Sequence, residues 1–250
     1  MQMPQVEDQV GLDELSWVDV AAHLARDPRL IVPVGALEQH GPHLPLGTNV
    51  LIARRIAVDL SREFNVLRAP TIYYGVNVPG ALEYAGTTTL RQKTLHRSLN
   101  ELLAGWEKHG LNEFVVITAH RHEPHLDALA TLITRRARVR VVSVWDVNIS
   151  DLLEVQPGPF HAGEAETSVM LYLYPEVVRM DRARDFALTP ELFRKYIKGK
   201  LPAAPAGGSG TVGHPTAATA EKGEAIYKRM LHVIGDAVFV APRDVESDTI

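Results

Sequence analysis

A glutamate, a histidine and an asparagine stand between a strand-like and a helix-like segment. The apolar, β-branched run 30–34 predicts a buried strand, which glycines and prolines end before helical periodicity resumes at Val50. Glu38, His40 and Asn49 therefore fall where ligands collect in an open α/β sheet. Alternate residues of an extended segment point to one side, so Glu38 and His40 should face one cavity. This arrangement resembles half of a metal site; the alternative is a polar turn with a capping Asn49 and a surface His40.

Two further polar clusters follow strand-like segments. Residues 118–125 are rich in histidine and come directly after the apolar run 114–117. Residues 160–168 carry a histidine and two glutamates, and they follow the strand-like segment 139–145 and a loop. Parallel strands would bring these ends to one edge of a sheet. We expect the three clusters to converge there.

Four segments resemble those of the creatininase, or creatinine amidohydrolase, family. The resemblance covers about residues 30–235, and the segments occur in the family's order. They are 32–49, similar to LPVGxEQHGPHLPLGTD; 118–120, similar to NGH; 161–168, similar to HAGxxETS; and 210–223, similar to GxPxxATxxKG. The first and third are specific, whereas the second is degraded.

The resemblance implies a three-layer α/β/α sandwich with a mostly parallel sheet. It also implies a centre of two divalent metals, usually zinc, manganese or iron, that hydrolyses cyclic amides or formamides. Glu38, His40 and His120 match metal ligands of the family. His161 matches a histidine that moves protons at the scissile bond, and Glu166 matches the glutamate of the ETS segment.

The chain departs from the family pattern at the metal site itself. Asn49 stands where the family has an aspartate that bridges the two metals, and an amide offers one neutral oxygen in place of two anionic ones. His122 replaces a carboxylate ligand, although imidazole is itself a good ligand for zinc or iron. Thr118 and Ala119 replace Asn-Gly. These departures leave open a one-metal enzyme, a two-metal enzyme with substitute ligands, or a degraded site.

Amide hydrolysis needs an activated water, a stabilised oxyanion and a protonated leaving nitrogen. A divalent metal can supply the first two and a histidine the third. We therefore expect one or two divalent ions (zinc, manganese or iron) per subunit, with His161 and Glu166 as catalytic residues. The expected metal ligands are Glu38, His40, Asn49, His120, His122 and Glu166. Glu164 is not expected to reach the metal, since residues two apart on a helix do not share a face.

Composition limits the class of protein. The 250 residues are 46% hydrophobic and 22% charged, which fits one globular domain over 1–250 with its motif-bearing core at about 30–235. A net charge of −4 gives no reason to expect nucleic acid. There are no cysteines, so any metal must use histidine, carboxylate or amide groups. No apolar run approaches a membrane span and no signal peptide is evident, so a cytoplasmic protein is expected.

Strand and helix patterns alternate through the first 150 residues, which predicts a parallel sheet with right-handed crossovers. The basic run 135–140 is interpreted as a solvated helix end, and a phosphate-binding patch is the alternative. Thr89 is interpreted as the cap of a helix. Residues 201–217 are interpreted as a flexible loop. The predicted strands are 30–34, 66–69, 113–118 and 139–145, and the predicted helices are 13–26, 48–64, 91–109, 125–137 and 217–235.

The loop 73–89 contains tyrosines that could line a substrate pocket or simply pack, and neither interpretation prevails. The leading functional hypothesis is a metal-dependent amidohydrolase that cleaves a C–N bond of a small cyclic amide or formamide. A non-catalytic member with a degraded site, and a peptidase of peptide maturation, are the alternatives. The resemblance also implies a homohexamer; the substrate is left unidentified.

Overall fold

The computed structural model describes residues 10–158, 160–200, 203–204 and 206–240. Its centre is a parallel four-stranded sheet in the order β2-β1-β3-β4. The strands are β1 Arg29–Val34, β2 Leu67–Arg68, β3 Glu113–Thr118 and β4 Arg138–Ser143. The helices are α1 Trp17–Leu24, α2 Thr48–Phe64, α3 Gln92–Glu107, α4 Glu123–Ala130, α5 Glu164–Leu173, α6 Pro190–Ile197 and α7 Ala220–Gly235. The predicted α/β class is confirmed.

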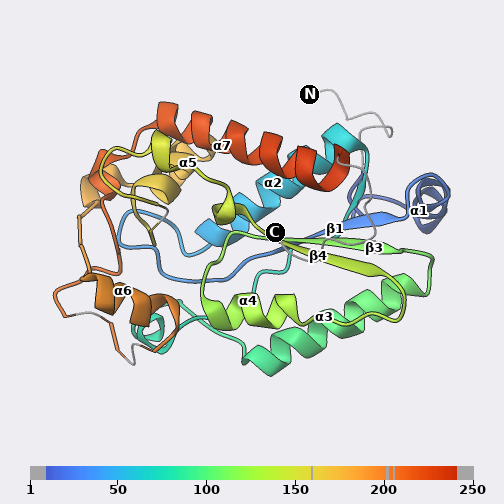
Figure 1. The fold of residues 1–250 in the computed structure, drawn as a ribbon, viewed down its shortest axis with the longest axis horizontal. Coiled ribbons are helices and arrows are strands. Elements are labelled where there is room, and N and C mark those ends of the chain that lie inside the picture. The colour runs from blue at the N-terminus through green and yellow to red at the C-terminus, as the bar shows by residue number, and fades with distance from the viewer. Residues whose placement is uncertain (1–9, 159, 201–202, 205, 241–250) are drawn as a thin grey trace.

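Helices cover both faces of this sheet, as Figure 1 shows. Because side chains alternate along a strand, Ile31 and Val115 belong to one buried cluster, which includes residues of α2, α5 and α7. Leu30 and Phe114 belong to a second cluster, which includes residues of α3 and α4. All four side chains are fully buried, and burying a side chain of this size contributes roughly 1.5–3 kcal/mol. The result is the expected α/β/α sandwich.

The register of the sheet aligns the carboxyl ends of its three longest strands. Val34 at the end of β1 pairs with Thr118 at the end of β3, and Thr118 pairs with Ser143 at the end of β4. The polar segments that follow β1 and β3 therefore start at the same edge of the sheet. This edge is where the sequence placed its candidate site.

Several predicted element boundaries are wrong, each for a local reason. Helix α1 starts at Trp17 because Ser16 and Asp19 form a capping box. Thr89 does not cap α3; its Oγ1 accepts the backbone N–H of Asn77, at 2.8 Å. Helix α4 ends at Ala130, before a segment in which Thr131, Ile133 and Thr134 are β-branched.

The basic run 135–140 is not a helix end. The backbone N–H groups of Arg135, Arg136 and Ala137 donate to the carboxylate of Glu107, and the chain then enters β4. Within the described ranges, no helix has the length and apolarity needed to cross a membrane.

Helix α6, at the lower left of Figure 1, was not predicted. Its signal was Thr189 as N-cap followed by Pro190, a combination typical of a helix start.

Candidate metal centre

The convergence of three sequence clusters is observed. Glu38 and His40 follow β1, Asn49 lies in the first turn of α2, and His120 follows β3. Glu166 lies in the first turn of α5, which enters the same region from another part of the chain. All five side chains are buried. Residues between 38 and 166 thus share one site beside the carboxyl edge of the sheet.

One group of possible metal ligands consists of Glu38, His120 and His122. Glu38 Oε2 lies 3.2 Å from His120 Nδ1, and Glu38 Oε1 lies 3.6 Å from His122 Nδ1. One ligand atom from each residue falls within 4.8 Å of the other two. The backbone carbonyl of Val76 lies 2.9 Å from His120 Nε2. If Nε2–H donates to it, the lone pair of Nδ1 faces the carboxylate, as a metal ligand requires.

A second group consists of Glu38, His40 and His161. His40 Nδ1 lies 2.9 Å from the carbonyl oxygen of Glu38, which orients Nε2 toward Glu166 Oε2 at 3.7 Å. His161 Nδ1 lies 3.9 Å from Glu38 Oε2. Glu38 therefore contributes to both groups through its two oxygens. Two cation positions that share Glu38 are geometrically available.

Asn49 lies between the two groups without the charge of an aspartate. Its Nδ2 lies 3.2 Å from Glu38 Oε2 and 2.9 Å from His120 Nδ1. In this orientation the amide donates hydrogen bonds to both side chains. The same side chain would have to turn its oxygen inward to bind a cation. Asn49 thus occupies the position expected of a ligand but stabilises the site as a hydrogen-bond donor.

Three buried polar atoms at the centre have no hydrogen-bond partner among the described residues. They are Glu38 Oε1, His40 Nε2 and His122 Nδ1. Leaving a buried acceptor unsatisfied costs about 1–3 kcal/mol, and more for a charged group. These donor types are those that zinc, manganese and iron accept. The residues present therefore fit a divalent cation.

The charges within the site are strongly coupled. Burial alone would raise the pKa of Glu38, but three neighbouring imidazoles, above all that of His161, hold it well below its usual value. Burial opposes protonation of His120, yet the adjacent carboxylate of Glu38 raises its pKa. A cation that binds here must displace the proton that this pair favours. Burial lowers the pKa of His122 to about 4, so this ring is neutral and its lone pair is free at neutral pH.

Only one of the two glutamates of α5 reaches the centre, as expected. Glu164 accepts Lys222 Nζ at 2.8 Å and the backbone N–H groups of Glu154 and Val155. Glu166 instead faces His40 and accepts the backbone N–H of Ala162 at 2.6 Å. Glu164 therefore fixes the start of α5 rather than contacting the metal groups.

Imidazoles and hydroxyls beside the centre hold its backbone in place. His125 Nε2 lies 3.1 Å from Thr118 Oγ1, and the same hydroxyl accepts the backbone N–H of His120 at 3.2 Å. His43 Nε2 lies 3.0 Å from Thr167 Oγ1. Both histidines are buried, so they support the centre rather than form part of the surface.

Ala162, next to His161, has φ of 51°, a left-handed conformation that alanine rarely adopts. Such strain is typical of functional segments.

Two residues that the sequence did not single out contact His161. Gln39 Nε2 lies 3.0 Å from His161 Nε2, and the ring of Tyr196 lies 5.7 Å from that of His161. Tyr196 also lines a cavity with an empty volume of about 400 Å³ beside His120, His122 and Glu166. Gln39 lies within the family-like segment 32–49, but the sequence offered no reason to expect a role for it. Tyr196 lies on the unpredicted helix α6, so no sequence signal placed it here.

Fold and site together define a class: an α/β/α protein with a buried glutamate–histidine cluster suited to a divalent metal at the carboxyl edge of its sheet. The sequence profile of the Creatininase family, creatinine amidohydrolase, matches residues 13–238. The creatinine amidohydrolase of Pseudomonas putida is 31% identical over 92% of this chain and 96% of its own length. The chain belongs to the creatininase family, which confirms the resemblance.

Other comparisons show both the fold and the range of the family. A mycofactocin precursor peptide peptidase of Mycolicibacterium smegmatis is 30% identical over 84% of each chain. A crystal structure of creatinine amidohydrolase matches with a TM-score of 0.78 and 27% identity, covering 92% of this chain and 96% of its own. Two further creatininase structures, one of a Zn–Zn type and one described as Mn, match with TM-scores of 0.77 and 0.76 at 28% identity, each covering 92% of this chain and 97% of its own.

Proposed function

We propose that this protein is a metal-dependent amidohydrolase that cleaves a C–N bond of a small cyclic amide or formamide. The observation that carries the proposal is the set of unsatisfied atoms on Glu38, His40 and His122, buried in one place. Membership of the creatininase family supports the same reaction class. The relatives of Zn–Zn and Mn type support zinc or manganese as the metal.

Glu38, His120 and His122 would hold one cation, and His40 with Glu166 would complete a second position. A bound divalent cation supplies Lewis acidity, which activates water and polarises an amide carbonyl. The second-position residues approach each other at 3.7 Å, between His40 Nε2 and Glu166 Oε2. Asn49 orients Glu38 and His120 by donating to both.

His161 is the proposed proton carrier. Its Nδ1 faces Glu38, and its Nε2–H can donate to the backbone oxygen of Gln39 at 2.9 Å, while Gln39 Nε2 lies 3.0 Å from the same ring nitrogen. Burial lowers the pKa of His161 to about 3, so the ring is neutral at neutral pH. It lines the cavity, where Nδ1 can take a proton from the attacking water and pass it to the leaving nitrogen. Glu166 accepts the N–H of Ala162 and so fixes the backbone that presents His161.

Metal content and hydrolysis test the proposal together. Inductively coupled plasma mass spectrometry of the purified protein should detect zinc, manganese or iron. His120→Ala should abolish binding, whereas His109→Ala, which removes an exposed imidazole, should not. Creatinine, a formamidopyrimidine and short peptides should be assayed with added Zn²⁺, Mn²⁺ or Fe²⁺. A protein that holds no metal after reloading, or one that binds metal but hydrolyses none of these amides, would contradict the enzymatic role and favour a non-catalytic member.

Peptide hydrolysis is a second candidate, favoured by the 30% identity to a precursor peptide peptidase. The same residues would act on an open-chain amide, so the site chemistry does not separate the two. Cleavage of short peptides without turnover of creatinine or formamidopyrimidine would select this candidate. The homohexamer implied by the family resemblance and the expected cytoplasmic location both remain predictions, and sedimentation velocity would test the assembly.

A further inference from the structure

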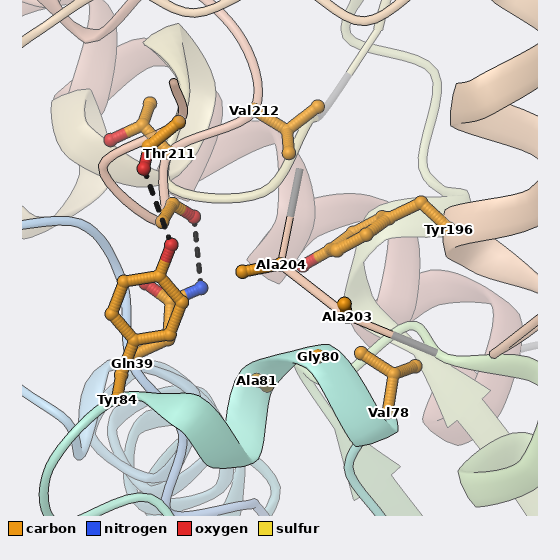
Figure 2. Close-up of a pocket in the computed structure, with 12 residues that line it drawn as sticks. Gln39, Val78, Gly80, Ala81, Tyr84, Tyr196, Ala203, Ala204, Thr211 and Val212 are labelled. Carbon is orange, nitrogen blue, oxygen red and sulfur yellow. Dashed lines mark hydrogen bonds between the residues drawn. The ribbon is translucent and has the colours of Figure 1, made fainter. Parts of the chain in front are cut away.

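A second cavity lies beside the metal centre (Figure 2), and its empty volume of about 350 Å³ includes space open to solvent. Its walls come from four parts of the chain, one of which is Gln39 in the segment after β1. Ala81 belongs to the 3₁₀ helix Pro79–Glu83, and Val78 directly precedes it. Tyr196 belongs to α6, and Val212 lies in the segment before α7. Tyr196 also lines the metal-side cavity, so one ring separates the two spaces.

The wall of this cavity is largely apolar, although Gln39 and Thr211 also line it. Val78, Ala81 and Val212 contribute aliphatic surface, and Tyr84 and Tyr196 contribute aromatic rings. No Asp, Glu, Lys or Arg is present among the described residues that line it. An ionised group would lose its hydration here without an opposite charge to compensate, which is costly. The cavity therefore selects an uncharged group.

Two buried wall residues, Tyr196 and Thr211, present hydroxyls with no hydrogen-bond partner among the described residues. The Tyr196 side chain is 94% buried, and its hydroxyl has no hydrogen-bond partner among the described residues. Figure 2 shows the hydroxyl end of the ring directed into the space lined by Gln39, Val212 and Ala204. The Tyr84 hydroxyl differs, because it donates to the backbone oxygen of Gly208 at 3.4 Å.

The cavity is coupled to the proposed proton carrier. Gln39 Nε2 lies 3.0 Å from His161 Nε2 and donates to the backbone oxygen of Gly210 at 2.8 Å, the bond drawn in Figure 2. The backbone N–H of Val212 donates to the carbonyl oxygen of His161 at 2.8 Å. The ring of Tyr196 contacts that of His122 edge-on at 5.1 Å. A molecule held in this cavity would therefore lie against residues that frame the metal centre.

We propose that this cavity binds the uncharged, apolar part of the amide substrate, and that the Tyr196 hydroxyl donates a hydrogen bond to an acceptor on that part. The inference rests on the proposed amidohydrolase function and adds a substrate class to it: neutral amides with an apolar group and an acceptor next to the scissile bond. A phenol keeps its proton at neutral pH, so the Tyr196 hydroxyl acts as a donor.

N-methyl-2-pyrrolidinone is a suitable probe, because it is neutral, apolar and has one acceptor. Its dissociation constant should be measured by ligand-observed NMR on the metal-loaded protein. Tyr196→Phe keeps the ring that packs on His122 and removes only the hydroxyl, so the dissociation constant should rise roughly three- to tenfold, as expected for one hydrogen bond. Tyr74→Phe removes the hydroxyl of a half-exposed tyrosine and should leave it unchanged. N-methylpyrrolidinium, a cation of similar size without the carbonyl, should not bind.

A second variant tests the location of the probe. Ala81→Leu adds volume at the wall and should abolish binding of N-methyl-2-pyrrolidinone while the metal content stays at the wild-type value. Circular dichroism would identify a misfolded variant, in which case the Tyr196→Phe comparison decides alone. Equal dissociation constants for wild type and Tyr196→Phe, no binding of the probe, or equal binding of the cation would overturn the proposal.

The two proposals can fail separately. Tyr196-dependent binding of the probe by a protein that hydrolyses no amide would refute the catalytic function and leave the subsite. Metal-dependent hydrolysis of a neutral amide with the same KM in wild type and Tyr196→Phe would refute the subsite and leave the function.

Discussion

Replacing Asn49 by aspartate tests how the centre balances its charge. Asn49 Nδ2 lies 3.2 Å from Glu38 Oε2, and both residues are buried. Asn49→Asp would place a second carboxylate there, and two unit charges at this distance repel by roughly 5 kcal/mol at an effective dielectric of about 20. Proton uptake and rotation of the new side chain would relieve part of this. We expect the metal-free variant to lose about 2 kcal/mol of unfolding free energy, or roughly 4–8 °C in Tm.

With metal present, Asn49→Asp should raise the unfolding free energy instead of lowering it. A carboxylate adds an anionic ligand that can bridge two cations, so the variant should bind Zn²⁺ or Mn²⁺ more tightly. Each tenfold drop in the dissociation constant adds about 1.4 kcal/mol of stability at saturating metal. Differential scanning fluorimetry with EDTA and with each metal would measure both effects. Mass spectrometry should show the metal-to-protein ratio rising toward two.

The matched control is Asn112→Asp, which makes the same substitution at an exposed position before β3. It should change neither the metal-free Tm nor the metal response. The reasoning would be refuted if Asn49→Asp were as stable as wild type in EDTA and also bound the same amount of metal. That result would mean that Asn49 does not lie against Glu38 in the protein.

Two other predictions follow from buried groups near the centre. Burial lowers the pKa of His43 to about 4, below the ordinary 6.5, so folded His43 resists protonation and stability should fall as the pH drops from 6.5 to 4. His43→Asn should remove up to about 3 kcal/mol of that fall, as measured by urea midpoints at each pH; parallel curves for the two proteins would contradict it. A Cβ on Gly210 would clash with Gln39 Oε1, whereas one on Gly207 would meet nothing within 4 Å, and both glycines have positive φ. Gly210→Ala should therefore lower hydrolytic activity by displacing Gln39 from His161, without loss of metal, and Gly207→Ala should show only the backbone cost of about 1 kcal/mol; equal activities would show that Gln39 does not position His161.

Local patterns were sufficient for the central elements. The predicted strand 113–118 and the predicted helix 48–64 coincide with β3 and α2. The strand is a nearly continuous apolar run and the helix has apolar residues at helical spacing, so local preference and tertiary packing agree. Boundaries failed where a side chain made an unforeseen contact, as at Thr89, whose hydroxyl accepts the N–H of Asn77 instead of capping α3.

The residue types of the site could also be predicted, but the residues that surround them, such as Tyr196, could not. Glu38, His40 and His120 were found because each follows a strand whose carboxyl end meets the others. The position of Tyr196 could not be found in this way. It depends on how α6 packs against the metal centre. The sequence of an eight-residue amphipathic helix does not indicate which surface the helix covers.

The sequence by itself determined the class of the fold, the family and the chemical types gathered at the sheet edge, because these depend on periodicity and on short motifs. Only the tertiary structure decided that Glu38 contributes to both ligand groups, that Asn49 donates to Glu38 and His120, and that Tyr196 directs a free hydroxyl into a second cavity. Those features depend on distances between side chains more than ten residues apart, which no local pattern encodes.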